Sequence, residues 1–125
     1  MFKKSGLQKR REIKAARVEK ARRGVVDVYG VEAPKGSLLA NKVILREVNP
    51  LGPLPNFYVD RHFECKDCGS DEVWTAKQQK WWYEMARGCI SSVAVRCRSC
   101  RYKEKLRKAE ARRVHLEGLE KKHNK

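Results

Sequence analysis

Four of the five cysteines stand in two pairs whose spacing is typical of a metal site. The pairs are Cys65-x2-Cys68 and Cys97-x2-Cys100, separated by 28 residues. Two such pairs can place four thiolates around one ion, which makes a closed tetrahedral site for Zn²⁺. Gly69 follows the first pair directly, and a glycine there permits the tight turn that points backbone amides at the sulfurs. The sequence therefore predicts one structural zinc ion held by four cysteines.

Other uses of these cysteines fit the sequence less well. Disulfides need an oxidising compartment, and nothing in the sequence suggests export. A thioredoxin-like redox pair needs a βαβ context, and haem attachment needs a histidine where Gly69 and Arg101 stand. Four thiolates can also hold iron or an iron–sulfur cluster, and this alternative stays open. Because four thiolates already satisfy zinc, His62 is not expected to be a ligand. The fifth cysteine, Cys89, is expected to be a small buried or half-buried residue.

The gap between the two pairs is long enough to contain a helix. Thr75 with Gln78 three residues later matches a capping box, which predicts a helix start. Gly88 stands where a C-terminal cap is expected. After it, the apolar residues at 89–90 and 93–95 predict a short hairpin or strand that leads into the second pair.

The aromatic residues of this helix could belong to the core or to a binding surface. At 100° per residue, Trp82 and Met85 fall on the apolar arc, so we expect both in the core. Trp81 or Tyr83 is then the aromatic residue expected to be exposed. Aromatic faces beside Lys and Arg can stack on bases, but a domain this small commonly uses its largest side chains as core.

Net charge is concentrated at the two ends of the chain. The 125 residues contain 30 Lys and Arg against 15 Asp and Glu, which gives +15. Residues 1–23 contribute +8 and residues 101–125 contribute +6, so the centre is close to neutral. Both ends are rich in helix-forming residues. The N-terminal end lacks a wide apolar face, so it is expected to be mobile and to order only on a partner. In the C-terminal end Tyr102, Leu106 and Leu116 follow a rough helical spacing, so its first turns could rest on the domain.

Such cationic ends are attracted to phosphate without sequence preference, although many charge runs are merely solvated surfaces. We therefore expect these ends to contact the backbone of RNA or DNA. The residues expected to do so are Lys9, Arg10, Arg11, Lys14, Arg17, Arg22, Arg23, Arg107, Arg112 and Arg113.

Residues 24–56 contain short apolar runs broken by turn residues. The run at 43–45 could form a strand or a short helix. Pro50, Pro53 and Pro55 exclude a helix or central strand after it, so this stretch is expected to be an extended linker draped over the neighbouring domain. Phe57, Tyr58 and Phe63 would anchor it there.

Several functional classes are disfavoured by the sequence. No stretch approaches the roughly 18 apolar residues of a membrane span. A catalytic zinc keeps one coordination position open for water, whereas four sulfurs would fill all four positions here. The sequence also has no nucleophile–base set or phosphate loop, so we do not expect an enzyme. The acidic residues at 60, 64, 67, 71 and 72 are expected to be surface charge balancing Lys66 and Arg61. Cytoplasmic residence is the default expectation.

These motifs together resemble the probable zinc-ribbon domain family of short bacterial proteins. The resemblance is carried by Tyr58-Val-Asp60-Arg-His-Phe63-x-Cys65-Lys-Asp67-Cys68-Gly69, by Trp74-Thr75-Ala-x-x-Gln79-x-Trp81, and by Arg96-Cys97-x-x-Cys100-Arg101. It implies a zinc ribbon with an inserted helix and ligation by the four cysteines, but no biochemical activity. Where the family pattern has a proline before the second pair, this chain has Val95.

The sequence thus predicts a small metal-stabilised α+β fold, a zinc ribbon with an inserted helix flanked by basic helical arms. The expected parts are a basic helical arm at 1–23, an irregular proline-rich linker at 24–56, the four-cysteine zinc-ribbon domain at 57–101 and a basic C-terminal helix at 102–125. The expected function is a nucleic-acid-associated binding module. The alternative is an adaptor that docks on an acidic protein through the ribbon and its exposed aromatic residues.

Overall fold

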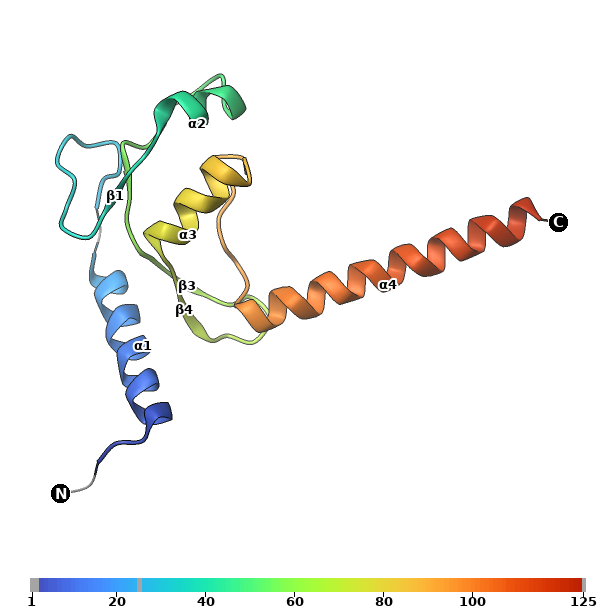
Figure 1. Cartoon of the computed structure of the whole chain (residues 1–125), viewed down its shortest axis with the longest axis horizontal. Coiled ribbons are helices and arrows are strands. Elements are labelled where there is room, and N and C mark those ends of the chain that lie inside the picture. Colours follow the sequence, from blue (N-terminus) through green and yellow to red (C-terminus); the bar gives the residue numbers. More distant parts are fainter. Residues whose placement is uncertain (1–2, 25, 125) are drawn as a thin grey trace.

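The computed structural model describes residues 3–24 and 26–124. They form a small α+β fold with two two-stranded antiparallel sheets, from which a long helix projects (Figure 1). In chain order the elements are α1 (Gly6–Arg23), β1 (Leu38–Leu39), α2 (Lys42–Val48), β2 (Phe57–Tyr58), β3 (Arg61–Glu64), β4 (Asp71–Trp74), α3 (Ala76–Lys80), the π-helical turn η1 (Trp81–Met85) and α4 (Arg98–His123). No helix in the described residues is long and apolar enough to cross a membrane.

The N-terminal arm is an ordered helix packed on the domain. Ser5 caps α1 by accepting a hydrogen bond from the Gln8 amide, and the helix ends at Arg23. It contacts strands β3 and β4, and it buries one residue, Val18. The structure thus gives α1 a partner in the domain's own hairpin, whereas the expected mobility of this arm stays a prediction.

The segment at 24–56 contributes to the core instead of acting as a linker. Its run at 43–45 lies in the short helix α2, which Asn41 caps, and Leu45 is fully buried. Strand β1 pairs with β2, with Leu38 opposite Tyr58. The proline-rich stretch at 50–55 lies between α2 and β2 and forms neither helix nor strand.

The core is built around stacked aromatic rings. The ring of Tyr83 lies 5.9 Å from that of Tyr58 and 5.6 Å from that of Trp74, measured between centroids. Leu45, Leu54 and Ala76 complete this cluster, while the expected anchor Phe63 is only partly buried against it. The core thus joins residues from the proposed linker, the hairpin and the inserted helix.

The inserted helix begins as predicted but then changes its hydrogen-bond pattern. The Thr75–Gln78 capping box is confirmed. From Trp81 the chain forms a π turn, in which the Ala86 amide bonds to the carbonyl of Trp81, five residues earlier, at 2.9 Å. The extra residue per turn rotates the following side chains away from their α-helical positions.

Because of this rotation, the prediction that Trp82 and Met85 lie in the core is wrong. Trp82 is 38% exposed and Met85 is 73% exposed, whereas Tyr83 and Glu84 are buried. Of the two candidates for exposure, Trp81 is the exposed one at 60%. The prediction failed because it assumed a regular 100° step through residues 81–85.

The end of the helix also differs in detail. Arg87, not Gly88, adopts the left-handed conformation, with φ of 56°. Gly88 is needed for another reason, because a Cβ there would lie 2.2 Å from the indole ring of Trp82.

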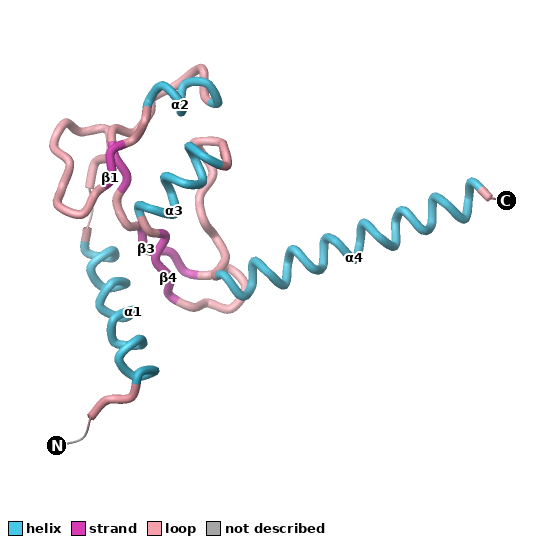
Figure 2. Tube along the Cα trace, viewed as in Figure 1, coloured by secondary structure: helices cyan, strands magenta, loops and turns pink. Residues whose placement is uncertain are grey.

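No hairpin or strand forms at 89–95. The Ser92 amide and hydroxyl both bond to the carbonyl of Cys89, so local turn bonds replace a ladder. Cys89 is exposed, which contradicts its expected burial. Figure 2 shows the whole connection from η1 to α4 as loop.

The C-terminal helix starts at Arg98, within the second cysteine pair, and leaves the domain (Figure 1). Its first turns do not bury the apolar stripe expected to rest on the domain. Tyr102, Leu106 and Leu116 are each more than half exposed. Beyond Cys100, every described residue of α4 is exposed except the half-buried Glu104.

Candidate metal centre

The first cysteine pair occupies the turn between β3 and β4. Cys65 follows the last residue of β3, and its amide bonds to the carbonyl of Ser70 at 2.9 Å. The amide of Gly69 bonds back to the carbonyl of Cys65, also at 2.9 Å. Gly69 has φ of 74°, which a side chain would strain. The prediction that this glycine serves a tight turn is confirmed.

The second pair lies at the start of α4. Cys97 is the N-cap residue, and its Sγ accepts a hydrogen bond from the amide of Cys100 at 3.5 Å. Cys100 is buried in the first turn. A helix N-terminus carries partial positive charge and favours thiolates there. A backbone bond from Lys66 to Val95, at 2.9 Å, joins the two halves of the site.

The four sulfurs converge on one point. All four Sγ atoms lie within 4.8 Å of one another, and those of Cys68 and Cys97 are 3.7 Å apart. A tetrahedral Zn–S distance of about 2.3 Å corresponds to sulfurs about 3.8 Å apart. The donor set and its spacing therefore fit a single structural zinc ion, as predicted.

The thiols do not ionise equally without a cation between them. Hydrogen bonds from the backbone of Cys68, and then of Cys97, lower the pKa of Cys65 to about 6. The hydrogen bond shared with Cys97, together with burial, raises the pKa of Cys100 to about 12. Four adjacent thiolates repel one another, so a divalent cation is what allows all four to be charged together.

The histidine and acidic residues near the first pair have other partners. His62 Nε2 lies 2.9 Å from Asp71 Oδ1. Asp71 also accepts from Arg22 at 3.2 Å, and Glu72 pairs with Lys14 at 2.8 Å. These acids bind α1 and do not balance Lys66 and Arg61 as expected.

Asp60 and Asp67 also have structural partners. Asp60 accepts a hydrogen bond from the amide of Ala76 at 2.8 Å, at the start of α3. Asp67 pairs with Arg96 at 2.7 Å, and this ion pair links the turn of the first cysteine pair to the segment before the second cysteine pair.

The ten basic residues predicted to contact nucleic acid divide into two sets. All ten lie on α1 or α4. Five are engaged in ion pairs, namely Lys14, Arg22, Arg23, Arg107 and Arg113. The other five have no ion pair within residues 3–24 and 26–124, namely Lys9, Arg10, Arg11, Arg17 and Arg112.

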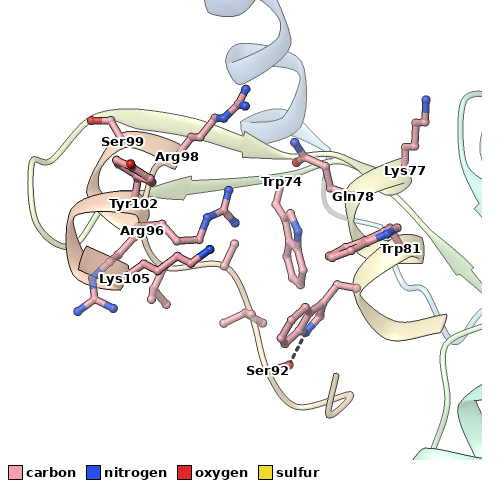
Figure 3. Close-up of a pocket in the computed structure, with 15 residues that line it drawn as sticks. Trp74, Lys77, Gln78, Trp81, Ser92, Arg96, Arg98, Ser99, Tyr102 and Lys105 are labelled. Atoms are coloured by element: carbon pink, nitrogen blue, oxygen red, sulfur yellow. Dashed lines mark hydrogen bonds between the residues drawn. The ribbon is translucent and has the colours of Figure 1, made fainter. Parts of the chain in front are cut away.

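The sequence analysis did not foresee a groove beside the metal centre. It has a volume of about 1170 Å³ and lies between the α3–η1 helix and the start of α4 (Figure 3). Its walls come from residues between 74 and 105, which are not contiguous in the chain. The exposed Trp81 was the one available signal for it.

Comparison with known proteins identifies the metal-binding part of the chain. No curated protein and no solved structure matches the chain detectably. Residues 59–109 match the family described as Probable treble clef domain, and all four clustered cysteines lie inside the match. This agrees with one pair in a turn between strands and the other at a helix start. Residues 59–109 are therefore a zinc-binding treble clef domain with four cysteine ligands.

Proposed function

We propose that the protein is a nucleic-acid-binding module in which the zinc domain is a scaffold and its basic helices contact phosphates. The observation that carries this proposal is the long helix α4. It leaves the metal centre as a single exposed helix and carries ten Lys and Arg against four Glu. Cations displayed in this way bind nucleic-acid backbones with little sequence readout.

The zinc ion in this proposal is structural, and the protein is not an enzyme. Four sulfurs fill a tetrahedral site and leave no position for a reactive water. The site requires reduced thiols, which supports a cytoplasmic location.

The available cations favour α4 over α1. In α1, Lys14 and Arg22 pair with acids of the hairpin and hold the helix in place. In α4, Arg107 and Arg113 pair only with glutamates of the same helix. Such exposed pairs are weak, so a phosphate can replace the glutamate at little cost.

The test is the salt dependence of binding to a generic RNA and a generic DNA duplex. The log of the binding constant should fall steeply with the log of salt concentration. Replacing Lys108 and Arg112 with Gln should make that slope shallower by roughly 1–2, because two phosphate contacts are lost. The matched control replaces Lys35 and Lys42 with Gln, since both lysines are exposed but lie outside α1 and α4. A flat salt dependence, or equal effects of the two double variants, would overturn the proposal.

The alternative is an adaptor that binds an acidic protein surface, for which the exposed Trp81 is the available feature. Affinity capture with and without nuclease treatment separates the two functions. Partners lost after nuclease treatment support the nucleic-acid module. Partners that persist unchanged favour the adaptor.

A further inference from the structure

The groove beside the metal centre concentrates positive charge. Its lining includes five cations and no Asp or Glu. The cations are Lys77, Arg96, Arg98, Arg101 and Lys105. Arg96 is paired with Asp67, but the other four have no ion pair in the described part of the chain. Three of these cations come from the nearly neutral centre of the sequence, whereas Arg101 and Lys105 come from its basic C-terminal end. The acids Asp71 and Glu72 pair with α1 instead.

The same groove exposes aromatic rings on its opposite walls. Trp81 of η1 and Tyr102 of α4 are each 60% exposed. Figure 3 shows Trp81 on the side of the inserted helix, Tyr102 on the side of α4, and Trp74 between them. Large exposed aromatic side chains gathered in one groove mark a binding surface more often than a solvated one.

One wall of the groove is held in place by contacts of Trp82. Its Nε1 donates to the hydroxyl of Ser92 at 2.8 Å, and its ring packs over Gly88. These contacts tie the loop before α4 to η1. The groove is thus largely pre-formed, so little of the binding free energy is lost in ordering its walls.

The combination of flat aromatic faces and unpaired cations selects the class of ligand. An acidic peptide would satisfy the cations but offers no set of flat faces for the rings. A nucleic-acid duplex offers phosphates but keeps its bases stacked inside. A single strand offers both, and stacking on aromatic side chains is how proteins bind it with little sequence preference. The volume exceeds that of an ordinary small-molecule pocket, so it can take more than one base.

We propose that this groove binds single-stranded RNA, with bases stacked on Trp81 and Tyr102 and phosphates held by Arg98 and Lys105. The proposal rests on the function proposed above and gives that module its ligand class and site. RNA is assigned over DNA because the Ser99 hydroxyl and the side-chain NH2 of Gln78, whose oxygen already accepts from Thr75, line the same groove as neutral groups. Groups of this kind can contact the ribose 2′-hydroxyl that DNA lacks.

The test measures binding of a 12-nucleotide oligouridylate to the full-length zinc-loaded protein by fluorescence anisotropy. Trp81→Leu and Tyr102→Ala should each weaken binding roughly 5- to 100-fold, as expected for a lost base stack, and leave the salt slope unchanged. Both side chains are mostly exposed, so the variants should keep their zinc and far-ultraviolet spectrum. The matched control is Tyr29→Ala, since Tyr29 is 54% exposed but lies outside the groove. This control should bind like the unmodified protein.

A second double variant tests the cations without touching the rings. Arg98→Gln with Lys105→Gln should make the salt slope shallower by about 1.4, because each phosphate contact to a single strand contributes about 0.7. The same oligomer in deoxy form should bind several-fold more weakly.

The outcomes separate this inference from the proposed function. If oligouridylate binds in a salt-dependent way but both aromatic variants bind normally, the groove is not the site, while the basic module stands. If the deoxy oligomer binds equally well, the assignment to RNA is overturned. If no nucleic acid binds at any salt concentration, the proposed function fails and this inference fails with it.

Discussion

Helices α1 and α4 look alike in the sequence, yet the fold uses them differently. Each is rich in Lys and Arg, and neither has a wide apolar face. Helix α1 lies along the β3–β4 hairpin, buries Val18 and makes ion pairs through Lys14 and Arg22. Helix α4 is attached at its first turn, where Cys97 and Cys100 belong to the metal centre, and the rest projects away.

The difference shows that charge composition does not decide whether a basic helix packs. Helix α1 packs because the hairpin presents Asp71 and Glu72 beside a site for one valine. Helix α4 has more apolar residues than α1, but the fold places no surface against them. Its position comes from the cysteine cluster at its first turn, and its cations other than Arg107 and Arg113 have no ion pair in the described residues.

Loss of the metal should have the largest effect on both helices. Cys97→Ser removes one ligand but keeps a residue that can cap α4, so the change acts on the metal alone. Because zinc binding to such sites contributes on the order of 10–16 kcal/mol near neutral pH, residues 60–101 should lose their structure. Helix α4 loses its anchor, and α1 loses the hairpin that supports it. Amide NMR spectra and zinc content measure these changes.

The matched control is Cys89→Ser, because Cys89 is exposed and lies outside the cluster. It should retain one zinc ion per chain and a dispersed spectrum. A dispersed, native-like spectrum from a zinc-stripped sample would show that the metal does not hold the fold.

A pair of valine substitutions tests the contrast between the helices directly. Val18 is 8% exposed on α1, and Val114 is 55% exposed on α4. Val18→Asp should release α1 and lower the free energy of unfolding by about 1.5–3 kcal/mol, the value of a buried valine. Much of the helicity of residues 6–23 should go with it, because an isolated helix is marginal in water.

Val114→Asp introduces the same charge and should change the free energy of unfolding by less than about 0.5 kcal/mol. Urea unfolding at a fixed free zinc concentration and hydrogen exchange of the α1 amides measure both variants. Equal effects of the two substitutions would mean that α1 does not pack on the hairpin.

The metal ligands were predictable because two short spacings specify them almost alone. The turn at Gly69 and the capping box at Thr75 are equally local, and both were predicted correctly. Each depends on residues a few positions apart, so no knowledge of the tertiary fold is needed.

The features that the sequence did not reveal depend on contacts between distant segments. The π turn at Trp81 decides that Tyr83 enters the core, and nothing in the local pattern marks that change of period. The packing of α1 depends on acids roughly fifty residues away. The groove depends on a helix that starts at the second cysteine pair and brings Tyr102 opposite Trp81.

The smallest effects should come from two carboxylates, one for each helix. The hydrogen bond from His62, helped by Arg22, lowers the pKa of Asp71, while Arg107 lowers the pKa of Glu104 to about 2. Asp71→Asn should speed hydrogen exchange at the C-terminal end of α1 a few-fold, because an exposed ion pair contributes little. Glu104→Gln should affect only the first turns of α4.

The sign of the pH dependence follows from these lowered pKa values. A carboxylate with a lowered folded pKa stabilises the fold above its ordinary pKa, near 4, and this contribution is lost as the pH falls through the folded value. Because Arg107 keeps its charge throughout, the effect of Glu104→Gln on exchange in α4 should be constant between pH 5 and 8. A change in that effect within this range would mean that Glu104 has a partner other than Arg107. Faster hydrogen exchange of the α1 amides in the same variant would mean that the stabilities of the two helices are coupled, although α1 packs on the hairpin and α4 projects from the domain.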